Sequence, residues 1–485
     1  TILYRFAGFI SGINLLLYML LVMGVFWLIG GVLTLPGIAA LVLGIGMAVD
    51  SCVITSERIK ESLEEGNSLK VAFKDGNKQS WSSIFDANVT TLIVAIVLFI
   101  FGESSVKGFA TMLMITIFAT MFIMVFINRL ILSGFVKTGR FDENPNKFVK
   151  YLKKNKEKRK KVNLKAVEIT KKCFTITLIY LVIGVIYLAV NGFNLGIDFR
   201  SGSDVTIKAD KITVSDVKKD FKKLKYDVVS VEKQENDEIY VRLNTELKEN
   251  GINKVNNYFE DKYNAKTEIN VVTDIVKQDL VKNAFYSVVI AAIAIIIYIS
   301  FRFKFSYAIS SITTLLHDVL LVMALFSIFK IEVNVIFIAA ILTVIGYSIN
   351  NTIVVFDRIR ENQGKYKGKL TRESLKKIVN DSVSDTITRS LYTTITTLIP
   401  VVCLIILGSK GILPFNIAII IGLVAGFYSS SFLAPQLWYK IESKNLPIDE
   451  RVSVKKKTEE NQDVIVQENN KKTTKKKAKK KKNKK

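Results

Sequence analysis

Long apolar blocks separated by shorter polar stretches run through most of the chain. Each block has about 20 residues, the length that an α-helix needs to cross the hydrocarbon core of a membrane. The pattern predicts a polytopic α-helical membrane protein with about ten transmembrane helices. The expected spans are residues 6–29, 35–55, 85–101, 109–132, 173–190, 284–301, 307–329, 333–356, 390–407 and 412–437. The polar stretches 57–80 and 357–385 are expected to be loops.

Two stretches resemble each other at a constant distance along the chain. Residues 45–61 and 345–361 are related by a shift of 300 without a gap, and both end in an acidic residue followed by Arg-Ile, a basic residue and Glu. Residues 90–93 and 396–399 both read Thr-Thr-Leu-Ile, and a glycine follows each first threonine by 12 residues. Repeated halves are typical of transporters with a site near mid-membrane. We therefore expect two pseudo-repeated halves, the alternative being a chance similarity of two membrane hairpins.

The hydrophilic stretch 191–278 has the pattern of a folded domain. Alternation predicts strands at 205–207, 226–231, 239–243 and 267–272, and helical spacing predicts helices at 214–224 and 247–263. The order strand–helix–strand–strand–helix–strand is that of an α+β ferredoxin-like domain. Its sequence shows no catalytic constellation, so its surface suits binding better than chemistry.

Charge predicts how the chain is oriented. The 485 residues include 68 Lys and Arg against 43 Asp and Glu, a net charge of +25. Basic loops stay on the cytoplasmic side, and the basic stretches 57–80, 137–172, 302–304 and 357–389 fall on one side if the spans alternate. Both termini of this chain are then cytoplasmic and the ferredoxin-like domain is extracytoplasmic. The run 471–485 holds 11 lysines and no acid, which predicts a disordered arm, or alternatively a contact with anionic lipid or the ribosome.

These patterns divide the chain into six parts. We expect a first transmembrane half with four spans (1–136), a basic cytoplasmic linker (137–172), one span (173–190), the extracytoplasmic domain (191–278), a five-span bundle (279–440) and a Lys-rich tail (441–485). The chain starts at Thr1 and becomes apolar almost at once, so we expect a fragment of a longer product.

Composition disfavours several kinds of site. His317 is the only histidine, and the three cysteines lie in or beside apolar blocks, which argues against haem, zinc and a disulfide framework. The sequence has no GxxxxGKS/T run, so no nucleotide-hydrolysing site is expected. We therefore expect no cofactor, no metal and no hydrolytic activity, with an ion gradient as the source of energy.

Ionisable side chains inside apolar blocks are the best candidates for function, because a charge in hydrocarbon is costly and marks a pathway or a relay. Asp50 lies well inside the second span, and His317-Asp318 lies midway along the seventh. A proton pathway needs groups that gain and lose charge, which favours these three residues. The alternatives are a static polar contact for Asp50 and a satisfied buried histidine for His317.

Other charged residues lie nearer to the ends of spans. Asp86 belongs either to the pathway or to the water interface. Arg389 begins the ninth span, and Asp385 lies one helical turn earlier, so these two could pair. Two further acid–arginine pairs are interpreted as boundary charges that fix the depth of the spans: Glu57-Arg58 and Asp357-Arg358.

Several long motifs resemble the SecD/SecF family, which belongs with the RND superfamily. They are residues 33–39 (LTLPGIA) with 46–50 (GMAVD), 86–93 (DANVTTLI), 106–110 (VKGFA), 196–199 (GIDF) with Gly202, 317–319 (HDV), 346–350 (GYSIN) and 355–362 (VFDRIREN). The resemblance covers residues 4–440 in the order of a fused SecDF. It begins late in the SecD half, so the N-terminal SecD portion is missing: either the chain is truncated or a separate subunit supplies that portion.

The resemblance implies an accessory subunit of the Sec translocon that uses the proton motive force to promote preprotein translocation across the bacterial cytoplasmic membrane. It implies as partners the translocon channel, unfolded preproteins and a separate SecD N-terminal portion. The candidate proton pathway consists of Asp50, Asp86, His317, Asp318, Asn350, Asn351 and Arg389.

Two departures from the family motifs matter. Asp50-Ser51-Cys52 stands where SecD has Asp-Ala-Asn, and Asn350-Asn351-Thr352 stands where SecF has Asn-Asp-Thr. An amide cannot carry a proton, so Asn351 predicts a degenerate SecF half that leaves Asp50 with His317-Asp318 to do the work. Asn351 also favours a second function, a non-energised scaffold for the translocon or ribosome that acts through the tail and the basic stretch 153–161. A third, an RND-type small-molecule exporter, is disfavoured by the single small outside domain.

Overall fold

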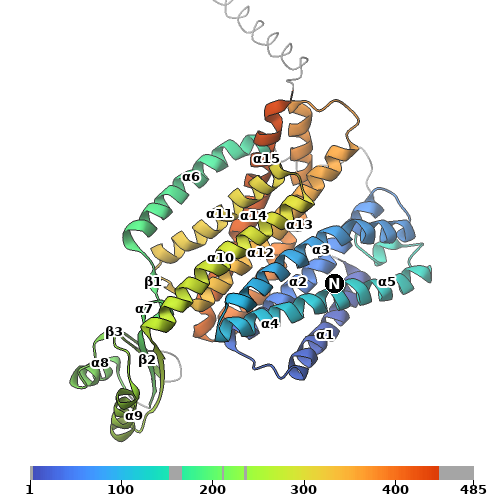
Figure 1. Cartoon of the computed structure of the whole chain (residues 1–485). Coiled ribbons are helices and arrows are strands. Elements are labelled where there is room, and N and C mark those ends of the chain that lie inside the picture. Colours follow the sequence, from blue (N-terminus) through green and yellow to red (C-terminus); the bar gives the residue numbers. More distant parts are fainter. Residues whose placement is uncertain (1–3, 152–165, 210–211, 234–237, 447–485) are drawn as a thin grey trace, which may run out of the picture.

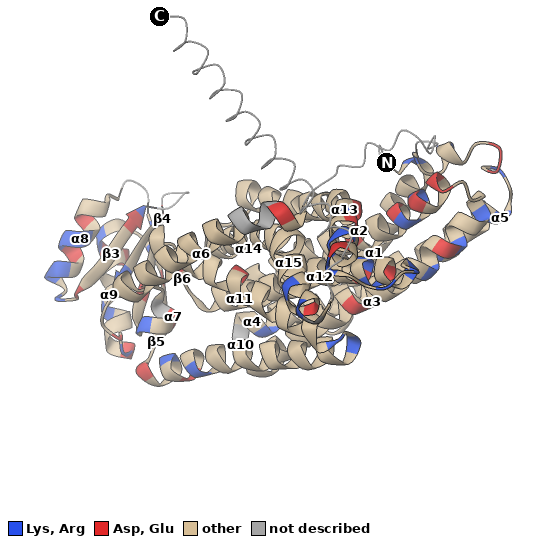
Figure 2. Ribbon diagram, turned by 90° about the horizontal axis from the view of Figure 1, so that it is seen from above, with Lys and Arg blue, Asp and Glu red and all other residues tan. Residues whose placement is uncertain are grey.

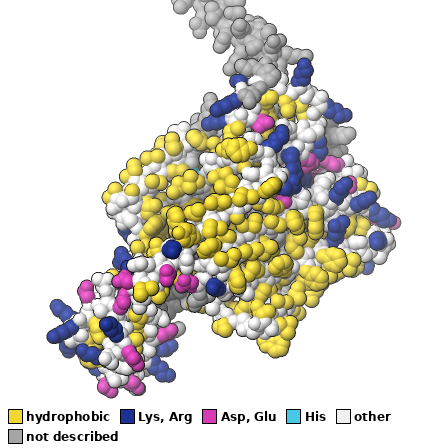
Figure 3. Space-filling model, in the orientation of Figure 1, with side chains coloured by type: hydrophobic (Ala, Val, Ile, Leu, Met, Phe, Trp, Pro, Cys, Tyr) yellow, Lys and Arg dark blue, Asp and Glu magenta, His cyan; other side chains and the backbone are white. Residues whose placement is uncertain are grey.

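The computed structural model describes residues 4–151, 166–209, 212–233 and 238–446. Within these ranges ten helices are long and apolar enough to cross a membrane, which confirms the predicted number. A broad apolar surface covers the face of the bundle seen in Figure 3. Charged residues gather on the small domain and at the ends of α3 and α5 that are far from it (Figure 2). The chain is therefore a multi-pass membrane protein. The basic stretch 153–161 and the Lys-rich run of the tail lie outside the described residues.

The first half contains three continuous helices and one helix in three segments. These are α1 (Arg5–Leu28), α2 (Leu35–Glu64), α3 (Leu69–Phe101), and α4 (Ser104–Ala119) continued by the π-helix η1 (Thr120–Ile127) and α5 (Asn128–Lys137). A short 3-10 turn, η2 (Pro145–Lys147), follows, and α6 (Ala166–Asn191) then leads to the small domain (Figure 1).

The second half repeats this order after α10 (Asp274–Arg302). Its helices are α11 (Phe305–Ile328), α12 (Val335–Lys365), α13 (Arg372–Leu407) and α14 (Leu413–Tyr428), continued by the π-helix η4 (Ser429–Leu433) and α15 (Ala434–Glu442). Two 3-10 turns, η3 (Lys410–Ile412) and η5 (Ser443–Asn445), flank the last helix. Both bounds of α11 equal those of α1 shifted by 300, and both halves contain a π-helical segment in their last helix. The two pseudo-repeated halves are thus confirmed.

The polar stretches 57–80 and 357–385 are mostly helical, so the prediction of loops was wrong. α2 continues to Glu64 and α3 begins at Leu69, while α12 continues to Lys365 and α13 begins at Arg372. Ion pairs about one turn apart support helix beyond the apolar blocks. Lys60 binds Glu57 at 3.1 Å, and Lys365 binds Glu361 at 2.6 Å. We call this end of the bundle, opposite the small domain, the basic end.

Glycines let the central helix of each half approach the third helix of the other half. A Cβ added to Gly46 of α2 would lie 3.1 Å from Thr397 of α13. At the equivalent place, a Cβ on Gly346 of α12 would lie 3.6 Å from Thr91 of α3. The same close approach therefore occurs twice, and it builds the interface between the halves.

The small domain has the predicted order of elements. Strands β2 (Gly202–Lys208), β3 (Val228–Lys233), β4 (Glu238–Leu243) and β5 (Lys266–Val272) form an antiparallel sheet in the order β3-β4-β2-β5. Helices α8 (Val214–Lys223) and α9 (Glu249–Tyr263) contribute to the apolar core. Val205, Ile207, Phe221 and Phe259 are fully buried in that core. The α+β ferredoxin-like fold is therefore confirmed.

A charged seam joins the domain to the start of α12. Strands β1 (Asn194–Leu195) and β6 (Glu332–Val333) pair in parallel, and the short helix α7 (Ile197–Arg200) follows β1. Asp198 accepts a hydrogen bond from the Val335 amide at 3.0 Å. Arg242 of β4 binds Asp204 at 3.2 Å and Glu332 at 3.1 Å. Burial raises the pKa of Asp198 and of Glu332 above their ordinary values.

Candidate functional site

Asp50 lies buried on α2 at the interface of the two halves. Its side chain is 8% exposed, and its Oδ2 accepts a hydrogen bond from Asn350 Nδ2 of α12 at 3.3 Å. Oδ1 has no hydrogen-bond partner among the described residues. Asp50 and Asn350 occupy equivalent positions of the repeat, so an acid meets an amide across the interface. A buried polar atom without a partner is costly, which makes this carboxyl group able to gain from binding a proton.

Arg389 of α13 is the nearby buried cation. It is 8% exposed, and its Nε and Nη2 atoms have no hydrogen-bond partner within the described part of the chain. It interacts with Asp50 electrostatically, without a salt bridge of 4 Å or less. Asp50 is thus neither in bulk water nor locked against a fixed cation.

A small cavity adjoins Asp50, which we call the Asp50 cavity. Ser51, Asn88, Thr91 and Asn350 contribute polar atoms to its walls, and it has room for a water molecule. Tyr347 also lines it and donates a hydrogen bond to the Leu43 carbonyl at 3.1 Å. A water in this cavity would give Asp50 a proton donor or acceptor. Asn351 is half-buried on α12 and has no side-chain hydrogen bond in the described ranges, so Asn350 is the amide that contacts Asp50.

His317 and Asp318 form a separate polar cluster inside the second half. His317 Nδ1 is 2.7 Å from Asp318 Oδ1, and His317 Nε2 contacts the Tyr180 hydroxyl of α6. Asp318 is fully buried, and its Oδ2 accepts hydrogen bonds from Ser429 at 2.8 Å and from Ser348. Ser348 is on α12, two residues before Asn350. The two clusters therefore share this helix without sharing a side chain.

Asp86 is held in a closed ion pair. Arg302 Nε of α10 lies 2.9 Å from Asp86 Oδ2, and the Tyr298 hydroxyl donates to Oδ1 at 2.7 Å. Asp86 is only 3% exposed. Both oxygens are occupied, so this acid has the contacts of a static link between α3 and α10.

Two arginines bridge the halves at the basic end, which goes beyond the interpretation as boundary charges. Arg58 binds Glu61 at 3.1 Å and Glu361 at 3.2 Å, while Arg358 binds Glu361 at 3.2 Å and Glu61 at 3.5 Å. These four residues are related in pairs by the shift of 300. Asp385 extends the network by binding Arg358 at 3.2 Å.

Sequence reasoning missed the side chains that contact Asp86, His317 and Asp318. They are Tyr298 and Arg302 at Asp86, Tyr180 at His317, and Ser348 and Ser429 at Asp318. A usable signal existed for one of them, because Ser429 begins a run of three serines inside an apolar block. The others are tyrosine, serine or arginine at ordinary positions, and only their contacts reveal them.

The fold and the buried acid define a membrane protein with the architecture of a transporter, in which two repeated helical halves meet at a polar site. The chain belongs to the SecD/SecF family: the model described as "Protein export membrane protein SecD/SecF, C-terminal" matches residues 2–138 and 252–444, and "SecD/SecF GG Motif" matches residues 186–211.

Relatives and solved structures agree with this family. The chain is 44% identical to protein translocase subunit SecDF of Bacillus subtilis, over 92% of this chain and 62% of that protein. It is 38% identical to protein translocase subunit SecF of Alicyclobacillus acidocaldarius, over 55% of this chain and 88% of that protein. The crystal structure of SecDF from Thermus thermophilus, described as a translocon-associated membrane protein, has a TM-score of 0.81 at 29% identity, over 91% of this chain and 60% of that chain. The chain thus spans about three fifths of the SecDF proteins that it matches.

Proposed function

We propose that the chain is part of an accessory subunit of the Sec translocon, which uses the proton motive force to promote preprotein translocation across the bacterial cytoplasmic membrane. The names of its relatives support the role in translocation. The observation that carries the energetic part is the Asp50 carboxyl group, which is buried between the halves with one oxygen free of partners. An acid in this setting is a functional candidate by default.

The proposed cycle uses the protonation of Asp50 to change how the halves pack. When Asp50 is ionised, the charge of Arg389 and the amide of Asn350 stabilise it. When Oδ1 binds a proton, the attraction to Arg389 is lost, so the preferred position of α2 against α12 and α13 changes. One charge moved through about 100 mV supplies roughly 2.3 kcal/mol, enough to shift a two-state equilibrium by a factor of roughly 50. The His317–Asp318 pair is a second candidate relay, reached from the other side of α12.

The basic stretches predict that the basic end is cytoplasmic, with the small domain outside and both termini of this chain in the cytoplasm. The proposed partners are the translocon channel, unfolded preproteins and a separate SecD portion. Contacts of the Lys-rich tail with anionic lipid or the ribosome would add to these.

Asp50→Asn tests this proposal because it keeps the shape and removes only the titration. We expect preprotein export in cells to fall to the level of a strain that lacks the protein, whereas Asp50→Glu retains part of the activity. Normal export with Asp50→Asn, at normal protein level, would rule out Asp50 as the coupling group.

A non-energised scaffold is the second candidate, and two observations favour it. Position 351, where the family has an acid, is an amide, and the Arg58–Glu361 network ties the halves together at one end. To separate the two, export is measured with and without an ionophore in strains with and without the protein. Proton coupling predicts that the ionophore abolishes the benefit of the protein, whereas a scaffold keeps that benefit.

A further inference from the structure

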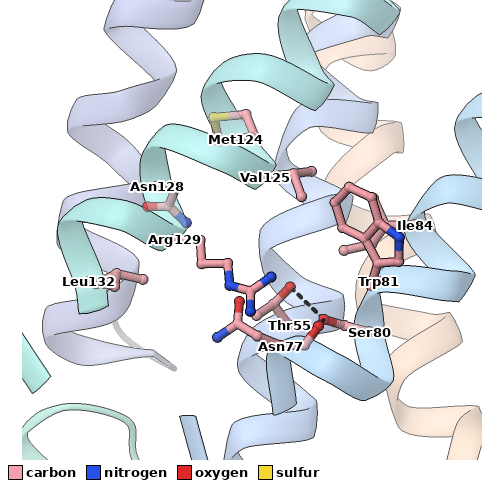
Figure 4. Close-up of a pocket in the computed structure, with 10 residues that line it drawn as sticks. All are labelled: Thr55, Asn77, Ser80, Trp81, Ile84, Met124, Val125, Asn128, Arg129 and Leu132. Atoms are coloured by element: carbon pink, nitrogen blue, oxygen red, sulfur yellow. Dashed lines mark hydrogen bonds between the residues drawn. The ribbon is translucent and has the colours of Figure 1, made fainter. Parts of the chain in front are cut away.

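A polar cavity opens at the basic end of the first half, between α2, α3 and α5 (Figure 4). Thr55, Asn77, Ser80 and Asn128 line it, and Thr55 Oγ1 donates to Ser80 Oγ at 3.1 Å. Figure 4 shows the Arg129 guanidinium reaching toward Thr55 and Asn77. Arg129 is exposed, and an exposed arginine on a membrane helix reaches water or headgroups. We call this space the outer cavity, meaning only that it lies nearer to the basic end than the Asp50 cavity does.

A small apolar cluster separates the outer cavity from the Asp50 cavity. Ile84 of α3 lines both cavities, Ile54 lines the Asp50 cavity and Val125 lines the outer one. These three side chains pack together apart from the main core, and Ile54 and Ile84 are each 2% exposed. We call them the Ile84 plug. An apolar constriction between two wet spaces blocks water by dewetting.

The repeat allows the lining of this route to be compared, position by position, with the second half. Residues of α2 and α12 correspond with a shift of 300, and those of the later helices with a shift of 306. The aromatic rings of the equivalent residues Phe109 and Phe415 meet 5.5 Å apart where the halves touch, which supports the second shift.

At the equivalent positions of the second half, four of the polar lining residues are replaced by apolar ones, whereas Ser80 corresponds to the buried Thr386. Thr55, Asn77, Asn128 and Arg129 correspond to Val355, Val383, Ala434 and Pro435, and all four replacements are buried. Leu132 corresponds to Trp438, which is fully buried. The half with Asp50 is therefore more polar along this path than the half with Asn350, where a buried tryptophan and four apolar residues occupy the equivalent positions.

We propose that the outer cavity is the water-filled route between Asp50 and the basic end, and that the Ile84 plug is its gate, closed in this conformation. Movement of α3 against α2 and η1 would part the plug and join the two cavities. Arg129, the charged residue at the mouth, disfavours cation uptake, so the route suits proton release toward the basic end. This purpose rests on the proposed proton coupling, but the route and gate can be tested without it.

Cysteine accessibility tests the route in lipid nanodiscs, where both membrane faces are open to reagent. The background replaces Cys52, Cys173 and Cys403 with alanine, and the reagent is a small, charged, water-soluble methanethiosulfonate. Thr55→Cys is compared with Val355→Cys at the equivalent position of the second half. We expect Thr55→Cys to react at least about tenfold faster, because buried thiols are inert. Equal rates at the two positions would overturn the route.

The gate is tested with Ser51→Cys, a position that lines the Asp50 cavity. We expect it to be protected when Ile84 is present, protected with Ile84→Leu, and labelled at a rate approaching that of Thr55→Cys with Ile84→Ala. Val125→Ala opens the plug from η1 and should act in the same direction, which covers the case in which Ile84→Ala fails to fold. Labelling of Ser51→Cys that does not depend on Ile84 or Val125 would overturn the gate. The export assay with Asp50→Asn decides proton coupling separately.

Discussion

Two buried aspartates in this chain have opposite surroundings. Asp86 has both oxygens occupied by Arg302 and Tyr298, with a nitrogen–oxygen distance of 2.9 Å to the arginine. Asp50 has one long hydrogen bond from an amide, at 3.3 Å, and one free oxygen. Removing the charge of Asp86 would leave the Arg302 guanidinium without its ion-pair partner, which would lower the stability of the fold. Removing that of Asp50 leaves no ion pair broken, so its loss should affect function more than folding.

Gly422 of α14 lies so close to α12 that no larger residue fits there. A Cβ there would lie 2.1 Å from Val344 Cγ2, whereas nothing lies within 4 Å of a Cβ at Gly24. We expect Gly422→Ala to destabilise the bundle by about 1–3 kcal/mol through overpacking, and Gly24→Ala to have little effect. Thermal unfolding in detergent measures the difference. Equal unfolding temperatures of the two variants would contradict the close packing of α12 on α14.

The hydrogen bonds of Asp220 make the stability of the small domain depend on pH. Burial alone would raise the pKa of Asp220, but hydrogen bonds from Lys262, Tyr263 and Tyr258 hold it below its ordinary value. Because the folded pKa is lowered, this stabilisation is present above about pH 4, the unfolded pKa, and is lost as pH falls through the folded pKa.

We expect Asp220→Asn to lower domain stability by about 2 kcal/mol at pH 7, the scale of hydrogen bonds to a charged group. The difference from the unmodified chain should shrink toward pH 3. Hydrogen exchange of the β2 and β4 amides in the full chain measures it at both pH values. Asp227→Asn, at an exposed position, is the control and should have no effect at either pH.

At the scale of elements, apolar blocks predicted where helices cross the membrane but not where they end. The spans were found because about 20 apolar residues are needed in hydrocarbon. The helical extensions at Glu57–Glu64 and Asp357–Lys365 were missed, because their stability comes from side-chain pairs one turn apart and from contacts across the halves. Thr371 and Ser374 form a capping box that starts α13, a local signal that the hydrophobic pattern does not contain.

The arginine network at the basic end allows a test of the repeat itself. Arg58 and Arg358 share Glu61 and Glu361, so each can partly replace the other. We expect Arg58→Gln and Arg358→Gln each to cost about 1 kcal/mol and the double variant to cost more than their sum, since linked residues are non-additive. The free energies of unfolding of the unmodified chain, the two single variants and the double variant, measured in detergent, complete the double-mutant cycle. Strict additivity would show that the four residues do not act as one network.

At the scale of the whole molecule, one apolar groove at the domain end is open and its equivalent is filled. The open groove, about 450 Å³, lies between α2 and α13 and is lined by Leu35, Ile38 and Cys403. In the equivalent place between α12 and α3, helix α10 contributes Leu280, Ala284 and Ser287. If the proposed SecD portion is a partner, the open groove should receive one transmembrane helix from it, in the position that α10 occupies in the other half.

The exposed Cys403 is a native probe of that groove. We expect it to react with a lipid-soluble maleimide in the chain alone and to become protected when the SecD portion is co-expressed. Val97→Cys, at the equivalent filled position and 6% exposed, should be protected in both cases. Unchanged labelling of Cys403 in a co-purified complex would place the partner elsewhere.

The fold was largely predictable from sequence, and the site only in part. Hydrophobic periodicity gave the spans and the ferredoxin-like order, and a fixed shift gave the two halves. Asp50, His317 and Asp318 stood out as charges in apolar blocks. The environments that distinguish Asp50 from Asp86 were not predictable, because Arg302 and Tyr298 lie more than 200 residues from Asp86. The outer cavity also depends on three helices whose facing sides no local pattern specifies.

The contacts of β1, β6 and α7 fix the start of α12 to the small domain, so a tilt of the domain would tilt the whole helix. Asp198 holds the first turn of α12 through the Val335 amide, and Arg242 holds Glu332 just before it. The 31 residues of this helix make a rod about 46 Å long at 1.5 Å per residue. A tilt of about 5° at the small domain would therefore displace the opposite tip by roughly 4 Å, more than the length of any ion pair there. A force on the small domain would therefore move Asn350 first and then, further along α12, the arginine network at the basic end.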